Sequence, residues 1–291
     1  MALIIQLLFD GLAMGLVFIL LATGLVLISS VNRMLFMAYA MFYTLGAYIT
    51  WLLFQRVGVP YLAAVLGGVL FAAALGSLAY IFIFRRVQAT EGGFLATLIA
   101  SMGLNMVLEK GNLLIFGTAP KNIPTAFKGI LEIGGLSMTA DKLVLIFIGV
   151  GITGLLFLVY EKTRLGRAMR SVAISPDVAQ LMGVNTVGIY VATMAIGTGL
   201  AGLAGGILAP SYGISPSMGG NVLWTVMLMT MLGGMDSMIG AVIGGIVIGE
   251  MLSFGQYFIG STIEIVVFLF IGVVLYFKPH GLLGKGIDIG L

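Results

Sequence analysis

The chain contains no cysteine and a single histidine, and charged residues make up only 9% of its 291 positions. The absence of cysteine excludes disulfides, thiolate catalysis and cysteine-ligated metals. One histidine, His280, cannot by itself build a metal site or a histidine-based triad. We therefore expect no catalytic residue, no metal site and no cofactor bound to this chain.

Hydrophobic residues make up 60% of the chain, and 43 residues are glycine. Soluble domains carry about 45–50% apolar and about 25% charged residues. A water-soluble fold of this length cannot bury so much apolar surface. The composition excludes a soluble enzyme, a nucleic-acid binder and a disordered chain, and it predicts an all-α polytopic membrane protein with one transmembrane domain over residues 1–291.

Apolar runs separated by charges or by Pro/Gly clusters predict eight or nine membrane-embedded helices. A span needs about 20 residues, so the run 221–232 is short and is interpreted as a half-span. No Lys or Arg precedes Arg33, which favours a retained first span over a cleavable signal peptide. The predicted helices cover residues 3–29, 34–54, 58–84, 92–116, 143–160, 188–209, 221–232, 238–256 and 262–277.

Lys and Arg residues predict the orientation, because positively charged loops stay in the cytoplasm. With the N-terminus outside, nine cations face the cytoplasm and four face outward. The cytoplasmic set is Arg33, Arg85, Arg86, Lys162, Arg164, Arg167, Arg170, Lys278 and Lys285; the outer set is Arg56, Lys121, Lys128 and Lys142. This orientation places a tail, 278–291, and the largest loop, 161–187, in the cytoplasm. Residues 117–142, with Gly134 and Gly135 at a turn, are then an ordered or hairpin-like external loop.

The loop 161–187 contains a short predicted helix over residues 176–182. Ser175 is a good N-cap, Pro176 suits the first helical position, and Asp177 favours the positive helix end. Gly183 provides the stop. A helix of about two turns is marginal in water, so it needs a surface to pack against. Two interpretations remain open: the helix docks into a soluble partner and transmits force, or it lies along lipid headgroups, with Arg164, Arg167 and Arg170 near the contact.

Ionisable residues inside predicted spans mark a function or a buried pair. Neighbouring Glu109 and Lys110 point to different helix faces, so we expect no pair between them. Glu250 lies nearest the middle of its span and is the best candidate for an interior role, either an inter-helix hydrogen bond or a substrate contact.

Glycines at four-residue spacing predict close helix packing. The pairs are Gly11/Gly15, Gly202/Gly206, Gly240/Gly244 and Gly245/Gly249. By contrast, Pro210, Pro216, Gly213, Gly219 and Gly220 predict a helix interruption over residues 209–220. The interruption either lines a translocation path or is a plain external turn.

The chain has no GxxxxGK[ST] sequence, so it lacks the common phosphate-binding loop. Energy for transport must come from an ion gradient or from a separate subunit. An intramembrane enzyme is disfavoured, since the common nucleophile–base pairs and metal ligands are missing.

From about residue 5 to 285 the sequence resembles the permease subunits of branched-chain amino acid ABC importers, of the LivH-like branch. The matching segments are DGLAMGLVFILLATGLVLI near the start, FYTLGAY (42–48), TRLGRAMRSVAISPDVAQLMGVN (163–185), ISPSMGG (214–220), GGMDSMIGAVIGGIVIG (233–249) and KPHGLLG (278–284). The resemblance implies a multi-pass protein of a bacterial or archaeal inner membrane, in contact with lipid and not with nucleic acid.

The resemblance further implies three kinds of partner: a second permease, identical or LivM-like, two cytosolic ATPases that hold ATP and Mg, and a periplasmic solute-binding protein. The chain itself is then not an enzyme. The ATPase-coupling residues would be Arg164, Gly166, Arg167, Arg170, Ser175, Pro176, Asp177, Leu181 and Gly183.

One segment departs from the family pattern. Where relatives often show a polar run resembling Asn-Phe-Ala-His-Gly-Glu, residues 36–41 read FMAYAM. The resemblance implies transport of branched-chain or other hydrophobic amino acids or a related small organic solute. If these positions face the path, however, the path is more apolar and less charged than usual, which disfavours a branched-chain amino acid and leaves room for aromatic acids or other small organic solutes. Alternatively they face lipid or a neighbouring helix. The candidate path residues are Tyr39, Met41, Tyr43, Ser215, Pro216 and Glu250. The competing function is an ion-gradient-driven secondary transporter that uses Glu250.

Overall fold

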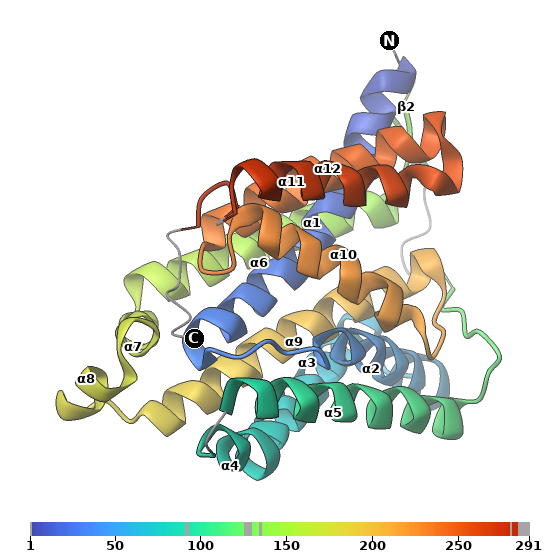
Figure 1. Cartoon of the computed structure of the whole chain (residues 1–291). Coiled ribbons are helices and arrows are strands. Elements are labelled where there is room, and N and C mark those ends of the chain that lie inside the picture. The colour runs from blue at the N-terminus through green and yellow to red at the C-terminus, as the bar shows by residue number, and fades with distance from the viewer. Residues whose placement is uncertain (1, 91–92, 125–129, 134–135, 280, 285–291) are drawn as a thin grey trace. The chain divides into compact units, whose positions relative to one another are not determined.

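The computed structural model describes the chain except residues 1, 91–92, 125–129, 134–135, 280 and 285–291 (Figure 1). His280, Lys128, Lys285 and the Gly134–Gly135 turn therefore lie outside the described residues. Six described helices are long and apolar enough to cross a membrane, and two apolar helices are shorter. The six spans contain α1 (Ala2–Asn32), α3 (Tyr61–Ala79), α5 (Gly93–Phe116), α6 (Ala140–Lys162), α9 (Thr186–Tyr212) and α11 (Met238–Phe258), and the shorter helices are α10 (Met218–Gly233) and α12 (Ile263–Phe277).

The chain divides into two compact units. Unit 1 comprises residues 1–26, 125–153 and 225–291, and unit 2 comprises residues 27–124 and 154–224. Helices α1, α6 and α10 each contribute residues to both units.

In unit 2 the core is formed by α2 (Tyr39–Leu52), α3 and α9. Glycines lie where these helices cross. A Cβ added at Gly202 would lie 2.7 Å from the Ala72 Cβ, and one added at Gly206 would lie 2.8 Å from the Thr50 Oγ1. The Gly202/Gly206 pair therefore packs closely, as the sequence predicts.

In unit 1, α1 and α11 cross through two glycine pairs. A Cβ at Gly249 would lie 2.5 Å from the Gly15 Cα and 2.7 Å from the Gly11 carbonyl oxygen. A Cβ at Gly15 would lie 3.0 Å from the Gly245 oxygen. The two predicted pairs thus pack against each other, backbone on backbone.

The fourth pair packs within the α10–α11 hairpin of unit 1. Gly240 contacts the backbone of Gly233 at the end of α10, and a Cβ at Gly244 would lie 2.7 Å from the Met229 carbonyl oxygen. Ser237 caps α11 by accepting a hydrogen bond from the Gly240 amide at 3.0 Å. The close approach predicted for Gly240/Gly244 is confirmed.

The first predicted boundary is wrong by several residues. Helix α1 runs to Asn32, and α2 begins at Tyr39 and not at residue 34, because residues 33–38 form a non-helical connector. Ser101 on α5 satisfies part of that connector: its Oγ accepts from the Met37 amide at 3.2 Å and lies 3.2 Å from the Leu35 carbonyl oxygen, to which it can donate.

Two helices change their winding near their ends. A π-helical segment, Leu53–Val57, follows α2, and another, Tyr80–Phe84, follows α3 and leads into α4 (Arg85–Gln88). Periodicity of apolar residues does not distinguish these turns from ordinary helix. The predicted helix 58–84 therefore includes the second segment, and the predicted helix 34–54 ends inside the first.

The interruption near residue 213 is narrower than predicted. Pro210 lies inside α9, which continues to Tyr212, and Gly219 and Gly220 lie inside α10. Proline is accommodated in the last turn of α9, and the chain leaves the helix at Gly213, whose φ is +69°. The non-helical stretch is therefore only 213–217.

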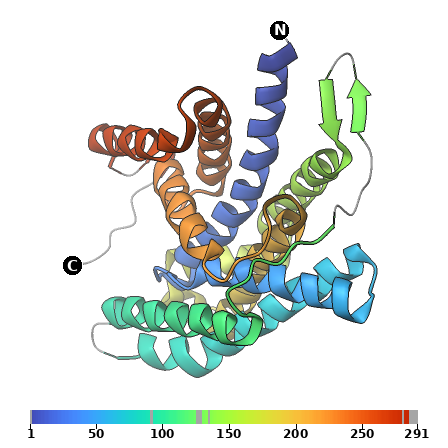
Figure 2. The same cartoon turned by 90° about the vertical axis from the view of Figure 1, so that its right-hand side faces the viewer.

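The segment before α6 forms a β-hairpin in unit 1. Strands β1 (Ile130–Ile133) and β2 (Leu136–Thr139) pair antiparallel, with residue 130 opposite 139, and β2 leads directly into α6 (Figure 2). An ordered, hairpin-like structure is what the turn residues of this segment predict.

One expectation about charges is wrong. The Lys110 Nζ lies 3.2 Å from a carboxylate oxygen of Glu109. Both side chains are long enough to bend around the helix surface, although their Cα–Cβ bonds diverge. An exposed pair of this kind contributes little to stability.

Candidate functional site

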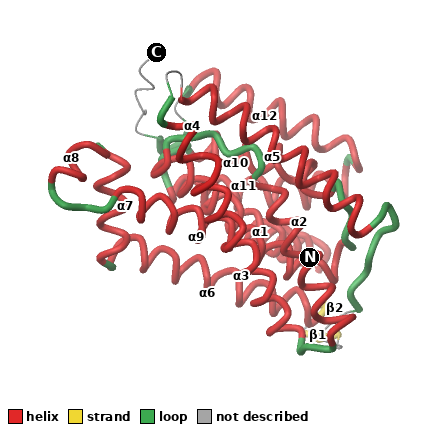
Figure 3. Tube along the Cα trace, turned by 90° about the horizontal axis from the view of Figure 1, so that it is seen from below, coloured by secondary structure: helices red, strands yellow, loops and turns green. Residues whose placement is uncertain are grey.

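Residues 161–187 fold into two short helices between α6 and α9. Helix α7 covers Arg164–Ile174 and α8 covers Pro176–Leu181, so the predicted helix 176–182 is present and ends one residue early. Both helices lie beside the N-terminal end of α9 (Figure 3). We call residues 161–187 the α7–α8 segment.

The ends of α8 have the predicted capping residues. The Ser175 Oγ accepts a hydrogen bond from the Val178 amide at 3.4 Å, Pro176 occupies the first position, and Asp177 lies in the first turn. Gly183 follows with φ +83°, a left-handed conformation that glycine adopts without penalty. The start and stop signals read from the sequence are confirmed.

Helix α8 and the residues that flank it expose most of their apolar side chains. Ala179 is buried, whereas Leu181 and Met182 are 87% and 80% exposed, and Ile174 and Val178 are 80% and 54% exposed. We call these four side chains the α8 apolar surface. It lies outside the helices that qualify as membrane spans. Exposed apolar side chains that cluster within nine residues, as these do between positions 174 and 182, are typical of an interaction site.

The turn between α6 and α7 uses two of the predicted coupling residues. Gly166 lies against the carbonyl groups of Val159 and Tyr160, where a Cβ would clash. Arg170 folds back onto the end of α6, with its guanidinium bonded to the Tyr160 carbonyl and 3.6 Å from the Glu161 carboxylate. Gly166 and Arg170 therefore stabilise the turn between α6 and α7, whereas Arg164 and Arg167 are exposed.

Arg33, at the end of α1, also contacts the α7–α8 segment. Its Nη2 donates to the carbonyl oxygens of Ala173 at 3.1 Å and Ile174 at 2.8 Å. In the sequence Arg33 is only a topology marker, because nothing in the local pattern indicates a contact with residues 140 positions away.

Three candidate path residues lie on α2 in unit 2. Tyr39, Met41 and Tyr43 are all buried. Among the residues that the structure describes, the hydroxyl of Tyr39 is buried without a hydrogen-bond partner. Such a group is able to bind a polar atom of a ligand or a water molecule.

Phe36, in the segment that departs from the family pattern, packs into an aromatic cluster. Its ring centroid lies 5.7 Å from that of Phe42 and 5.4 Å from that of Phe84, the latter edge-on. The Phe36 side chain therefore contacts α2 and the π-helical segment that follows α3.

Ser215 and Pro216 lie in the break between α9 and α10, which runs along α2. On one side of the break, Ile214 pairs with Lys121 through two backbone hydrogen bonds of 2.8 and 2.9 Å. On the other side, a Cβ at Gly219 would meet the backbone of Ala40. The residues on either side of Ser215 and Pro216, Ile214 and Gly219, thus pack against α2, and this non-helical backbone lies against protein.

An aromatic cluster surrounds this break. Tyr48 stacks on Phe116 with ring centroids 4.1 Å apart, and the Lys121 ammonium lies 5.5 Å from the centre of the Trp51 ring. Ile214 is completely buried in the same cluster. The sequence alone does not predict that these residues meet, because they come from α2, from α5 and from the segments that follow α5 and α9.

Glu250 belongs to unit 1 and lies on α11. Its carboxyl group packs against Gly11 of α1, and one carboxylate oxygen is buried with no hydrogen-bond partner in the described part of the chain. The structure describes Glu250 in a different unit from the other candidate path residues.

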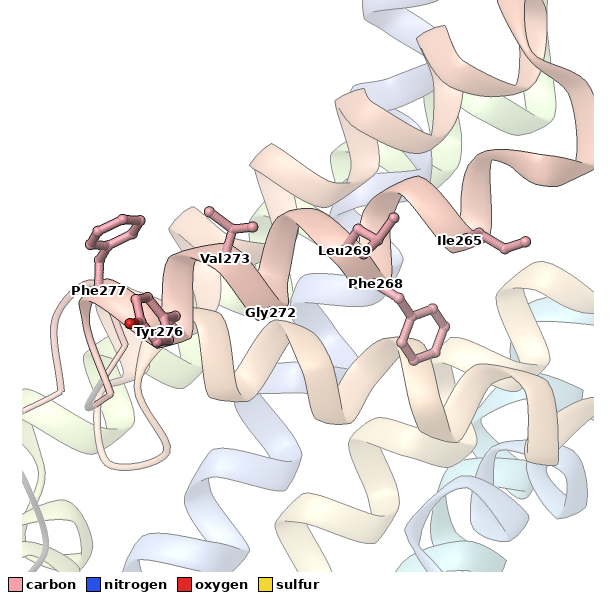
Figure 4. Close-up of a pocket in the computed structure, with 7 residues that line it drawn as sticks. All are labelled: Ile265, Phe268, Leu269, Gly272, Val273, Tyr276 and Phe277. Atoms are coloured by element: carbon pink, nitrogen blue, oxygen red, sulfur yellow. The ribbon is translucent and has the colours of Figure 1, made fainter.

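Helix α12 of unit 1 presents an apolar depression (Figure 4). Its lining residues all come from this one helix: Ile265, Phe268, Leu269, Gly272, Val273, Tyr276 and Phe277. An apolar face of this kind suits lipid tails or another membrane helix.

Apolar helices of spanning length with exposed apolar surfaces define the chain as a multi-pass α-helical membrane protein. The chain belongs to the family of permease components of branched-chain amino acid transport systems, whose sequence profile matches residues 7–278.

Individual relatives match over nearly the whole chain. The high-affinity branched-chain amino acid transport system permease protein BraD of Pseudomonas aeruginosa is 29% identical, with 97% of this chain and 96% of the relative covered. LivH of Escherichia coli K12, a permease protein of the same description, is 27% identical with the same coverage. Among solved structures, PsaBC from Streptococcus pneumoniae in complex with Fab has 16% identity and a TM-score of 0.49, with 91% of this chain and 90% of that chain covered.

Proposed function

We propose that the chain is a permease subunit of an ATP-driven importer, and that it carries branched-chain or other hydrophobic amino acids across the inner membrane. The relatives are permeases of branched-chain amino acid transport systems. ATP hydrolysis belongs to separate cytosolic subunits in this proposal, and a second permease and a periplasmic solute-binding protein complete the assembly. The N-terminus lies outside and the C-terminus in the cytoplasm.

The α8 apolar surface is the observation that carries the proposal. Helix α8 has six residues, which is too short for independent stability in water. Burying a large apolar side chain contributes roughly 1.5–3 kcal/mol, so a partner that covers Leu181 and Met182 would offset much of the cost of ordering the segment. A cytosolic ATPase that seats on this surface can push α7 and α9 through the chain connections at either end of α8.

The solute path in this proposal follows α2 and the break between α9 and α10. Buried Tyr39, Met41 and Tyr43 on α2, with Ser215 and Pro216 in the break, provide a mainly apolar lining with a few polar atoms. Such a lining favours a solute with a hydrophobic side chain. The charged ends of an amino acid would use backbone and hydroxyl groups.

An aspartate placed on the α8 apolar surface tests the proposal. We expect Leu181→Asp to reduce the amount of ATPase subunit that co-purifies with the chain at least tenfold, because a charge cannot be buried unpaired. Gln180→Asp places the same charge at the exposed neighbouring position and should retain the ATPase. Equal ATPase recovery from both variants would contradict the docking role of α8.

The alternative is a secondary transporter driven by protons or sodium. It is favoured by one observation, the buried Glu250 carboxylate oxygen without a hydrogen-bond partner among the described residues. Uptake of L-leucine by the purified single chain in vesicles under an imposed ion gradient would support this alternative and contradict the need for an ATPase.

A further inference from the structure

We propose that Arg33 is a positioning residue that ties the α7–α8 segment to the α1–α2 connector, so that a displacement of α8 reaches α2 as well as α7 and α9. The inference rests on the proposed function, since it concerns how a movement imposed by the ATPase spreads through the permease. All residues involved belong to unit 2.

The Arg33 guanidinium binds the last turn of α7. The two carbonyl groups that it contacts, those of Ala173 and Ile174, directly precede Ser175, the N-cap of α8. Carbonyl groups at a helix C-terminus carry partial negative charge and lack partners within the helix. A charged donor on such carbonyls forms stronger hydrogen bonds than a neutral one. Arg33 therefore binds the α7–α8 segment at the point where α7 ends and α8 begins.

The backbone of Arg33 indicates that its side chain is needed at this position. Its φ is +49°, and it is the one non-glycine residue with positive φ in the described part of the chain. A residue with a Cβ is unfavourable in this left-handed conformation, which glycine or asparagine adopts more easily. Strain of this kind persists where the surrounding structure requires the residue.

The residue before Arg33 is bonded to two other helices. The Asn32 Nδ2 donates to the Tyr190 carbonyl oxygen on α9 at 3.4 Å. The Gln88 Nε2 on α4 donates to the Asn32 carbonyl oxygen at 3.0 Å, and the Gln88 Oε1 accepts from the Tyr80 hydroxyl at 3.1 Å. The Asn32–Arg33 junction thus joins α1, α4, α7 and α9 in one hydrogen-bonded cluster.

This junction gives α8 a connection to α2 that the chain itself does not provide. Along the sequence, α8 is joined only to α7 and α9. From Arg33, the connector 33–38 leads directly to Tyr39 at the start of α2. Because the connector is held by Ser101 and is not helical, a pull on Arg33 is transmitted to α2 by a short, packed segment.

The test compares the movement of the connector with that of α8. The chain has no cysteine, so Met37→Cys in the connector and Gln180→Cys on α8 each create a unique thiol. The importer, purified with its ATPase subunits and reconstituted in liposomes, is labelled with a maleimide before and after trapping with ADP–vanadate. Each cysteine is placed in three backgrounds: the parent with Arg33, the variant Arg33→Asn and the variant Arg33→Lys. Asparagine tolerates the backbone conformation at position 33 but lacks the guanidinium.

We expect trapping to change the labelling rate at both cysteines when Arg33 is present. With Arg33→Asn, the change at position 180 should persist, while the change at position 37 falls by about tenfold, the factor carried by one charge-assisted hydrogen bond. Arg33→Lys should lie between the two. Arg86→Asn is the matched control, because the Arg86 side chain is exposed and makes no hydrogen bond or ion pair with the described residues; this variant should behave as the parent.

An unchanged response at position 37 in Arg33→Asn would overturn the inference and leave the proposed function intact. Loss of the ATPase from both Arg33 variants would also overturn it, since Arg33 would then hold the fold together and not transmit movement. If neither cysteine responds to trapping even with Arg33 present, the proposed function fails, and the inference fails with it.

Discussion

The crossing of α1 and α11 in unit 1 predicts a graded response to added methyl groups. Gly249→Ala would place a Cβ 2.5 Å from the Gly15 Cα and 2.7 Å from the Gly11 oxygen, both backbone atoms that cannot rotate away. The helices must therefore separate. Overpacking of this kind costs about 1–3 kcal/mol. We expect Gly249→Ala to destabilise the protein more than Gly15→Ala, its partner across the same crossing.

Two other glycines of unit 1, Gly15 and Gly272, provide the comparison for the stability loss expected at Gly249. Gly15→Ala would bring its Cβ to 3.0 Å from the Gly245 oxygen, which requires a smaller shift than at Gly249. Gly272 on α12 has no described atom within 4 Å of an added Cβ, so Gly272→Ala is the matched control. At an open helical position, alanine stabilises by about 0.4–1 kcal/mol through the unfolded state.

Thermal unfolding in detergent, followed by loss of the monodisperse peak in size-exclusion chromatography, measures the effect. A change of 1 kcal/mol shifts Tm by about 2–4 °C in a chain of roughly this size. The expected order of Tm is Gly272→Ala highest, then Gly15→Ala, then Gly249→Ala. If Gly249→Ala were as stable as the parent while Gly272→Ala lost stability, the glycine-mediated crossing would be refuted.

Substitutions at three further positions probe α8, its C-terminal stop and α11. Ser175→Ala removes the N-cap of α8 and should destabilise that helix by about 1 kcal/mol, seen as faster hydrogen exchange at the Val178 amide; unchanged exchange would contradict the cap. Gly183→Ala meets no atom within 4 Å, so its cost is only the left-handed backbone, about 1–2 kcal/mol. Gly183→Asn should recover part of that loss in the same exchange experiment, and an asparagine variant no better than alanine would argue against backbone strain. Glu250→Gln keeps the shape of the side chain and should preserve ATP-driven uptake of L-leucine, whereas abolished uptake would favour the ion-coupled alternative.

The elements of this fold are largely predictable from sequence, because a bilayer makes apolar run length a strong signal. The caps of α8 were predictable for a second reason: Ser175, Pro176 and Gly183 act on backbone groups within a few residues of themselves. Local chemistry of this kind is visible in a single sequence.

Contacts between distant segments could not be read in the same way. The α1–α2 connector depends on Ser101, more than 60 positions away, and Arg33 depends on carbonyl groups 140 positions away. The glycine pairs were visible, but which pair meets which was not, because spacing alone does not name a partner. The sequence assigned the candidate path to α2, to the break after α9 and to Glu250. The structure adds that the break lies against α2 and describes Glu250 in the other unit.

The pairing of Lys121 with Ile214 has an evolutionary consequence. Both of its hydrogen bonds use main-chain atoms, and each residue supplies one donor and one acceptor. The two hydrogen bonds therefore do not depend on which side chains these positions carry, and proline, which lacks the amide hydrogen, is the exception. In descendants of this protein, Lys121 can change at the loss of its contact with Trp51, whereas the completely buried Ile214 is restricted to apolar side chains.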